Sequence, residues 1–350
     1  MPARPGRFMS EAFPLGVHLG ERLTLDQTWW QASFADTHGF DSVWVAEGRM
    51  SRDGIVPAAV IVSNTEHVRV GTGVVNNKTR NAALMAVTFK TLDEMAPGRI
   101  ICGIGAWWEP IASKVGAPLV RPVTAMREYV TVLQRIFRNE TVSFSGDFVH
   151  MDGVRFDSMY HENRPVDIPI YFGSVGPRML ELAGEIADGV HLDFLLPVSY
   201  LKGAMEAVNR GVTRRDDGRG PVHVTQIIAC SVDDDDPDEA VDACRAFLTL
   251  YLMQQPHIAQ HCGVEPELVA RVKEVAGWPA RPDDVKRAMR LVPTSLVHRV
   301  AACGTSDRAF SKLAEYHEAG VDLPIISTHG KKEATLMALA RAAGRDGPAS

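Results

Sequence analysis

The chain has 350 residues, of which 45% are hydrophobic and 23% are charged, and its formal net charge is -6. A chain of this size and composition buries a large core, and its acidic balance argues against a nucleic-acid partner, which would require clustered Lys and Arg. No apolar stretch approaches the roughly 18 residues that a membrane span requires, so we expect no membrane partner.

The first half of the chain alternates short apolar runs with segments of helical periodicity. The predicted strands cover residues 15–19, 42–46, 68–72 and 100–105. The predicted helices cover residues 24–38, 57–63 and 82–95, and a fourth runs from Pro122 or Thr124 to about Arg138. The segment before the first strand, residues 1–13, lacks the apolar core of a signal peptide, and we interpret it as a disordered lead-in.

The second half continues this alternation with two interruptions. Residues 141–167 alternate polar and apolar positions around two glycines, as a β-hairpin does. The next strands are predicted at 168–172, 189–192, 222–229 and 324–327, and the helices at 178–187, 200–210, 238–252, 306–319 and 332–343. Between the seventh and eighth strands, the chain to Leu296 reads as a largely helical excursion broken by prolines.

Eight short strands that alternate with helices predict an α/β fold, a closed parallel (β/α)8 TIM barrel. The hairpin is inserted before the fifth strand and the helical excursion before the eighth. A Rossmann fold is the alternative, but G-x-G-x-x-G follows none of the strands. The sequence has no low-complexity tract and no Gly/Ser linker, so we expect a single domain over residues 1–350.

The numbers and spacing of cysteine and histidine residues indicate the cellular compartment and whether a metal site is expected. The five cysteines are an odd number and none form a C-x-x-C pair, which indicates free thiols in a reducing cytoplasm. The 12 histidines form no H-E-x-x-H pattern, so we predict no metal site.

Two predicted strands end in turns of small residues. Residues 174–177 (SVGP) follow the fifth strand, and residues 103–106 (GIGA) end the fourth. Small residues allow close approach of backbone to a ligand, and the N-terminus of the next helix favours phosphate. Each turn alone is equally well an ordinary helix start, but two on neighbouring strand ends favour a phosphorylated cofactor.

Polar residues at other strand ends are candidates for chemistry. His18 lies within the first strand and Glu47 ends the second, where each is either an acid or base or a satisfied structural residue. For Glu47 the structural alternative is an ion pair with Arg49 or Arg80. The pair Trp107-Trp108 after the fourth strand would either contact an aromatic ligand or pack the loop against the protein. His191, Asp193 and His329 complete the polar groups expected on this face.

Five segments of the chain, in order, resemble the luciferase-like monooxygenase superfamily, and within it the coenzyme F420-dependent branch typified by methylenetetrahydromethanopterin reductase. They are HGFDSVWVAE, VRVGTGVVNNKTRNAALMA, TLDEMAPGRIICGIG, PIYFGSVGPRMLELAGEIADGV and CGTSDRAFSKLAEYHEAGVD. The resemblance implies a barrel with a long insertion before the eighth strand, a hydride-transfer cofactor at the carboxyl face, a small-molecule substrate and a homodimer.

The resemblance also implies where the cofactor binds. It places a non-prolyl cis peptide at Gly73-Val74, bulging against the deazaflavin ring, and the cofactor phosphate against two turns. The residues that it assigns to the cofactor are Thr72, Gly73, Val74, Asn76, Gly105, Ala106, Trp107, Ser174, Val175, Gly176, Pro177, Arg178 and Met179.

The chain departs from the reductases at its candidate catalytic positions. His18 stands where they have a glutamate, and Glu47-Gly48 where they have an Asp-His pair. These departures predict a substrate other than a methylene-pterin. The expected activity is hydride transfer between F420 and a small organic substrate, with His18 or Glu47 moving the proton. The alternatives are a reduced-FMN monooxygenase, a flavin-free NAD(P)H-dependent reductase and a catalytically silent cofactor-binding protein.

Overall fold

Eight parallel strands close into a barrel in this computed structural model, which describes residues 13–157, 159, 163–215, 218–277, 280–345 and 347. Around the barrel they follow the order β1, β2, β3, β5, β8, β9, β10 and β12, and β12 pairs back to β1. They span Gly16–Leu19 (β1), Ser42–Val45 (β2), Arg69–Thr72 (β3), Ile100–Gly105 (β5), Ile170–Gly173 (β8), Gly189–Leu192 (β9), His223–Val232 (β10) and Leu323–Thr328 (β12). The predicted TIM barrel is confirmed.

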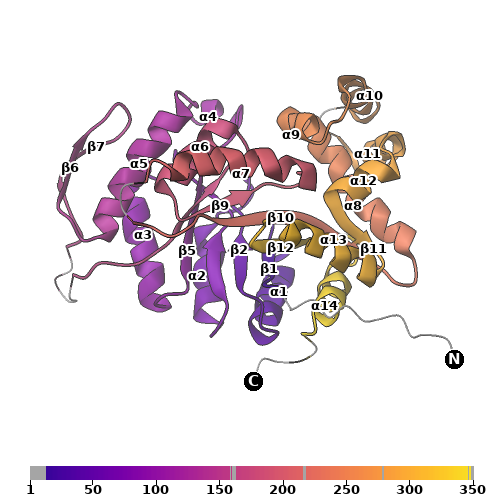
Figure 1. The fold of residues 1–350 in the computed structure, drawn as a ribbon, viewed down its shortest axis with the longest axis horizontal. Helices are drawn as coiled ribbons and strands as arrows, with labels where there is room; N and C mark the ends of the chain where they lie inside the picture. The colour runs from indigo at the N-terminus through magenta and orange to yellow at the C-terminus, as the bar shows by residue number, and fades with distance from the viewer. Residues whose placement is uncertain are drawn as a thin grey trace.

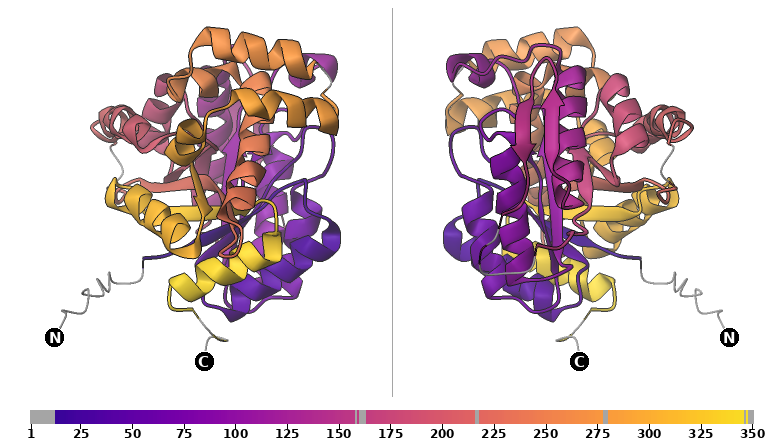
Figure 2. Two further views of the ribbon diagram at one scale, coloured as in Figure 1. Left: turned by 90° about the vertical axis from the view of Figure 1, so that its right-hand side faces the viewer. Right: turned by 90° about the vertical axis from the view of Figure 1, so that its left-hand side faces the viewer.

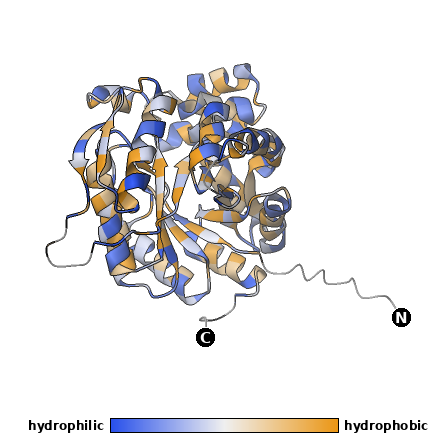
Figure 3. Ribbon diagram, turned by 60° about the vertical axis from the view of Figure 1, so that its left-hand side comes forward, coloured by the Kyte–Doolittle hydropathy of each residue, from blue (hydrophilic) through white to orange (hydrophobic). Residues whose placement is uncertain are grey.

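Helices surround the barrel on its outside (Figures 1 and 2). The helices of the barrel repeats span Leu25–Thr37 (α1), Ile55–Ser63 (α2), Ala82–Met95 (α3), Pro122–Phe137 (α5), Pro177–Ile186 (α6), Val198–Val212 (α7), Ser306–Glu318 (α13) and Lys332–Ala342 (α14). The central strands are mostly hydrophobic, whereas hydrophilic residues spread over the outer helices and loops (Figure 3). This pattern is expected because parallel strands in a barrel are covered on both faces.

Local sequence explains where several helices begin. Thr24 and Gln27 form a reciprocal capping box at the start of α1, in which each side chain accepts a hydrogen bond from the other's backbone N–H. Asn81 caps α3 and Thr305 caps α13 through their side-chain oxygens. Each cap satisfies an N–H group that the helix itself leaves without a partner.

Both predicted insertions are present. The hairpin consists of Val142–Ser145 (β6) and His150–Val154 (β7), which pair antiparallel outside the barrel beside α5 (Figure 2, right). The carboxylate of Glu128 on α5 accepts hydrogen bonds from three backbone N–H groups of its turn, at 2.8 to 3.1 Å. The helical excursion consists of Pro237–Gln254 (α8), Pro256–His261 (α9), Pro266–Ala276 (α10), Pro282–Ala288 (α11), Met289–Leu291 (η1) and Thr294–Val300 (α12).

Three short elements were not predicted. Strand β11 (Ala301–Gly304) pairs with the last residues of β10, which runs three residues further than expected. A two-residue strand, Val75–Asn76 (β4), pairs with β5, and a one-turn helix, Ile111–Lys114 (α4), follows β5. β11 is short, and its pairing depends on a partner about 70 residues away, which local periodicity does not reveal.

The expectation for the N-terminus is corrected at one residue. Residues 1–12 of the expected disordered lead-in lie outside the described residues. Phe13, which we included in it, is buried, and its ring stacks on Phe310 and His317 of α13 with centroids 5.4 and 4.8 Å away. An aromatic side chain with such neighbours belongs to the core.

The described ranges contain neither a membrane-spanning helix nor a cluster of metal ligands. No helix there is both long and apolar enough to cross a membrane. No group of three or more His, Cys, Asp or Glu side chains is arranged to hold a metal ion among those same residues. All five cysteines are free thiols in buried positions.

Candidate active site

A cavity of about 770 Å³ opens at the carboxyl ends of the barrel strands. Residues that end or follow β1, β2, β3, β5, β8, β9 and β12 line it, together with one face of α8. Its volume falls within the roughly 300–1,000 Å³ of pockets that hold small molecules and cofactors. This is the face at which barrel enzymes assemble their sites.

Most of the predicted site residues meet in this cavity. Those that line it are His18, Glu47, Gly73, Val74, Asn76, Gly105, Ala106, Trp107, Ser174 and Val175. Thr72 and the four residues Gly176, Pro177, Arg178 and Met179 do not line it. Thr72 is buried behind the site, where its hydroxyl donates to the carbonyl oxygen of Gly103 at 2.7 Å and accepts from its N–H at 3.0 Å. Gly176 is the residue just before α6, and Pro177 and Arg178 in the first turn of the helix are exposed.

The bulge after β3 rests on glycines. The Gly73–Val74 peptide bond is cis, as the resemblance implies. A Cβ atom on Gly173 would lie 2.7 Å from Val74 Cγ2, and one on Gly105 would lie 2.8 Å from it. Glycine is therefore required at both positions, because Val74 turns its side chain onto their backbone. The backbone of the bulge then forms part of the cavity floor.

The turn after β8 carries an unsatisfied hydroxyl. Ser174 Oγ is buried and has no hydrogen-bond partner among the described residues. The adjoining helix α6 begins at Pro177, and no side chain caps its N-terminus. A free hydroxyl beside an uncapped helix N-terminus suits an anionic ligand group.

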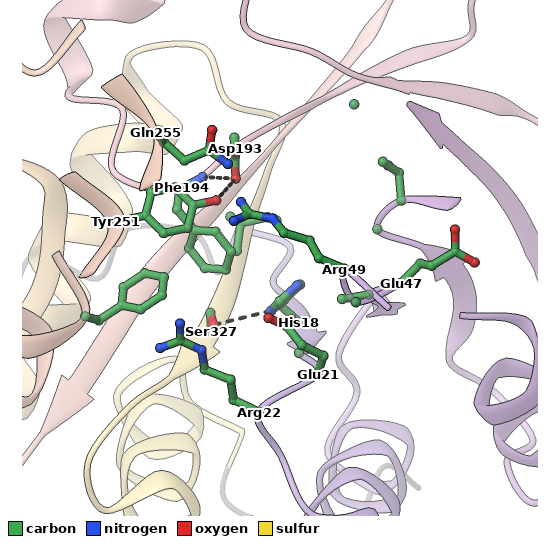
Figure 4. A pocket seen from close by; sticks show the side chains of 18 of the residues that line it. His18, Glu21, Arg22, Glu47, Arg49, Asp193, Phe194, Tyr251, Gln255 and Ser327 are labelled. Atoms are coloured by element: carbon green, nitrogen blue, oxygen red, sulfur yellow. Dashed lines mark hydrogen bonds between the residues drawn. The ribbon is translucent and has the colours of Figure 1, made fainter. Parts of the chain in front are cut away.

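Glu47 is held by structural partners. Its Oε1 accepts from the side-chain amide of Asn76 at 2.6 Å and from the Asn76 backbone N–H at 3.2 Å. Its Oε2 accepts from Arg80 at 2.6 Å, and Arg80 also pairs with Asp53. In Figure 4 its carboxylate points away from the other labelled residues of the cavity. Of the ion pairs considered for Glu47, the one with Arg80 is present.

His18 lies on β1, beside Ser327, and the carboxylate of Glu47 points away from it (Figure 4). Its Nδ1 is 3.3 Å from Ser327 Oγ, and its ring meets Phe194 edge-on with centroids 5.1 Å apart. Burial lowers the pKa of His18 to about 4, and the charge of Glu21 only partly opposes this. The imidazole is therefore neutral at pH 7.

Two further histidines line the cavity in neutral form. His191 stacks on Trp44 with centroids 4.5 Å apart, and its Nδ1 is 2.8 Å from Thr225 Oγ1. Burial lowers the pKa of His191 and of His329 to about 3 each. Nε2 of each ring is buried without a hydrogen-bond partner in the part of the chain that the structure describes.

Sequence reasoning missed the contribution of α8. Six of its residues, spaced by three and one along the helix, line the cavity: Ala243, Ala246, Phe247, Leu250, Tyr251 and Gln254. The Tyr251 hydroxyl donates to Asp193 at 2.8 Å, and Arg49 donates to Gln254 at 2.9 Å while its guanidinium lies 4.3 Å from the ring centroid of Trp108. The helical spacing is visible in the sequence, but it does not say that this face covers a barrel mouth.

Three charged residues of the cavity were also not predicted. Glu21 and Arg22 follow β1, and Lys332 begins α14 after β12. Their only sequence signal is their place just after a strand, the position that barrel enzymes use for their sites.

Comparisons with known proteins identify the family of the chain. The luciferase-like monooxygenase family matches residues 8–323. The chain is 29% identical to the 5,10-methylenetetrahydromethanopterin reductase of Methanolobus tindarius over 292 residues, or 83% of this chain and 86% of that one. It is 30% identical to the F420-dependent glucose-6-phosphate dehydrogenase of Intrasporangium calvum over 261 residues, or 67% and 74%.

The fold has relatives among solved structures. The coenzyme F420 dependent tetrahydromethanopterin reductase from Methanopyrus kandleri superposes with a TM-score of 0.82 at 23% identity, covering 94% of this chain and 97% of that one. At this identity the superposition concerns the fold alone. Because the family match covers most of the sequence, the chain belongs to the luciferase-like monooxygenase family.

Proposed function

We propose that this protein is an F420-dependent oxidoreductase that transfers a hydride between the deazaflavin and a small organic substrate. The observation that carries the proposal is the bulge at Gly73 and Val74, which lines the cavity and packs closely against Gly105 and Gly173. Relatives named as F420-dependent dehydrogenase and as methylenetetrahydromethanopterin reductase support the cofactor.

The residues present fit such a cofactor. The backbone at Gly73 and Val74 would support the ring system, and the turns at Gly105 and Ser174 would bind the phosphate. Ser174 Oγ, which lacks a hydrogen-bond partner among the described residues, offers a donor there, beside the uncapped N-terminus of α6. Bound F420 supplies a carbon that accepts or releases a hydride.

His18 is our candidate for the accompanying proton. A substrate alcohol that loses a hydride from carbon must also lose the proton of its O–H group. His18 is neutral at pH 7, and the contact of its Nδ1 with Ser327 leaves Nε2 without a protein partner among the described residues. In the reverse direction the same imidazole returns the proton to a carbonyl oxygen.

Glu47 serves as a positioning residue in this proposal. Asn76 and Arg80 together donate three hydrogen bonds to its carboxylate, which hold the side chain in one position. It links Asn76, two residues beyond the bulge, to Arg80. Between the two predicted catalytic residues, the proposal therefore favours His18.

A cofactor titration tests the proposed function. F420, FMN and NADPH are each added to the purified protein, and binding is followed by absorbance and fluorescence. We expect saturable binding of F420 and hydride exchange between F420 and an alcohol or carbonyl substrate. Binding of FMN with oxygen consumption, or of NADPH alone, would replace this proposal with the corresponding alternative. Tight F420 binding without turnover on a broad substrate panel would indicate a cofactor-binding protein.

Substitution of His18 tests its catalytic role. His18→Gln should lower kcat by about a hundredfold or more, the usual range for loss of a general acid or base. The Kd for F420 should change by no more than about threefold, because His18 is proposed to move the proton and not to bind the cofactor. Ser327→Ala, which removes only the contact to Nδ1, should lower kcat by a smaller factor. Equal kcat values for His18→Gln and wild type would exclude the imidazole from the reaction.

A further inference from the structure

One side of the cavity carries two cations that have no carboxylate partner. Arg22 follows β1, and Lys332 begins α14 just after β12, so neighbouring barrel strands bring them together. Among the described residues, neither forms an ion pair within 4.0 Å. Lys332 Nζ donates to the side-chain oxygen of Gln27 at 3.3 Å. Burial, and then the charge of Arg22, lower the pKa of Lys332.

The ring of Phe247 on α8 lies next to both Arg22 and His329. The Arg22 guanidinium lies 5.6 Å from the centroid of this ring, and the centroid of His329 lies 4.2 Å from it. His329 Nε2 is buried and makes no hydrogen bond to any described residue. Two cations and a polar ring atom without a partner therefore converge on one part of the cavity.

The acidic residues nearby leave this cluster positive. Glu47 is bound to Arg80, and Asp193 accepts a hydrogen bond from Tyr251. Glu21 lines the cavity next to Arg22 but forms no ion pair with it in the described part of the chain. Like charges held together without a counter-ion are unfavourable, and an anion bound between them would relieve the repulsion.

Strand order separates this cluster from the turns assigned to the cofactor phosphate. Four strands lie between β12 and β8 in one direction around the barrel, so β1 and β12 stand across the mouth from β5 and β8. His18 and Ser327 lie on the same side as Arg22 (Figure 4). A group bound by Arg22 and Lys332 would thus lie close to His18.

We propose that Arg22, His329 and Lys332 form a subsite for an anionic group of the substrate, a carboxylate or a phosphate ester. The inference rests on the proposed function and narrows it: the substrate is a small organic acid or phosphate whose alcohol or carbonyl carbon reacts beside His18. Arg22 would donate two hydrogen bonds, Lys332 would add a second charge, and neutral His329 would donate through its ring N–H.

Calorimetric titration with inorganic phosphate and with acetate, at constant ionic strength, tests the subsite on the intact protein. Arg22→Gln and Lys332→Gln should each weaken binding of the preferred anion about tenfold or more, as loss of a charge-assisted hydrogen bond does. Lys331→Gln is the matched control, because Lys331 is exposed and paired with Glu239 outside the cavity. Lys332→Arg, which keeps the charge, should retain binding. The anion that binds with the higher affinity shows whether the subsite prefers a phosphate or a carboxylate.

Two results would overturn the subsite. One is that neither anion binds to the wild-type protein, and the other is that Lys331→Gln weakens binding as much as Lys332→Gln. The Kd for F420, measured in the same variants, separates this inference from the proposed function. If Arg22→Gln weakens F420 about tenfold, the cluster belongs to the cofactor and the subsite proposal fails. If the wild type binds an anion but not F420, the subsite stands and the proposed function fails.

Discussion

The two sides of the barrel mouth differ in the residues that line them. On the side of β3, β5 and β8, Gly73, Gly105 and Gly173 line the cavity, and Glu47 after β2 is paired with Arg80. On the side of β1, β12 and α8, long charged and aromatic side chains form it, and Arg22 and Lys332 lack carboxylate partners among the described residues.

This difference bears on the proposal that one pocket binds both a cofactor and a substrate. A surface that includes Gly105 and Gly173 tolerates little change, because an added Cβ there would lie 2.8 or 2.7 Å from Val74 Cγ2. A surface of side chains on loops and on an inserted helix changes shape and charge with single substitutions. We therefore associate the first side with the constant ligand, the cofactor, and the second with the variable one, the substrate.

The largest effect is expected on the backbone side. In Gly103→Ala the new Cβ would lie 1.8 Å from the carbonyl oxygen of Thr72, a backbone atom that has no room to move. We expect a loss of unfolding free energy of about 3 kcal/mol, measured by urea unfolding. Gly203→Ala, on α7 with no atom within 4 Å of the added Cβ, should stabilise the protein by up to about 1 kcal/mol. Similar stabilities for the two variants would contradict the steric account.

The next effect concerns the ion pair behind the bulge. Glu47→Gln should lower the unfolding free energy by about 2 kcal/mol, because Arg80 loses a charged hydrogen-bond partner. Cofactor affinity should fall as well, because Asn76 loses its anchor. Glu181→Gln, which removes the surface ion pairs to Arg210 and Arg214, should cost less than about 1 kcal/mol. A loss of turnover with unchanged stability and affinity would instead make Glu47 catalytic.

The next prediction concerns the pH dependence of stability, where the expected effect within one pH unit is smaller. His191 in the folded protein has a pKa of about 3, below the ordinary value of 6.5, so the unfolded chain binds its proton first. The stability that neutral His191 contributes is fully present above pH 6.5 and is lost as the pH falls toward 3. His191→Gln should reduce the slope of unfolding free energy against pH by about 1.4 kcal/mol per pH unit between pH 6 and 4. Between pH 7 and 8 the two slopes should agree.

The smallest effect concerns the contact that joins the two sides. Arg49 reaches from the loop after β2 to Gln254 of α8 and stacks over Trp108. Arg49→Lys keeps the charge but loses the flat stacking surface, which should cost about 0.5–1 kcal/mol. Denaturant unfolding measures this loss of unfolding free energy, and Arg49→Ala should lose more than Arg49→Lys. No difference among the three proteins would show that the two sides are not coupled through this residue.

Much of the barrel could be predicted because its signals are local. Apolar runs, capping residues and glycine-ended strands indicated eight strands and both insertions from residues close in sequence. The glycines at Gly73 and Gly105 marked the floor of the cavity correctly. Phe13 and strand β11 were missed because each packs against a segment that is distant in the chain.

The candidate site could be predicted only in part, for the same reason. Strand ends identified His18 and Glu47, but the sequence left open whether Glu47 was paired with Arg49 or Arg80 or was free to react. That choice depends on which loop reaches over which, a property of the packed structure. The positive cluster at Arg22 and Lys332 joins opposite ends of the chain, and no local pattern connects them.

The stripe of α8 that lines the cavity has a practical consequence. Its six cavity positions belong to one continuous helix inside an insertion, so a single short synthetic gene cassette spans all of them. A library randomised only at Ala243, Ala246 and Leu250 would reshape the chamber while leaving Phe247 and Tyr251 in place. Selection from such a library would find variants that accept other substrates while the residues proposed to bind the cofactor stay unchanged.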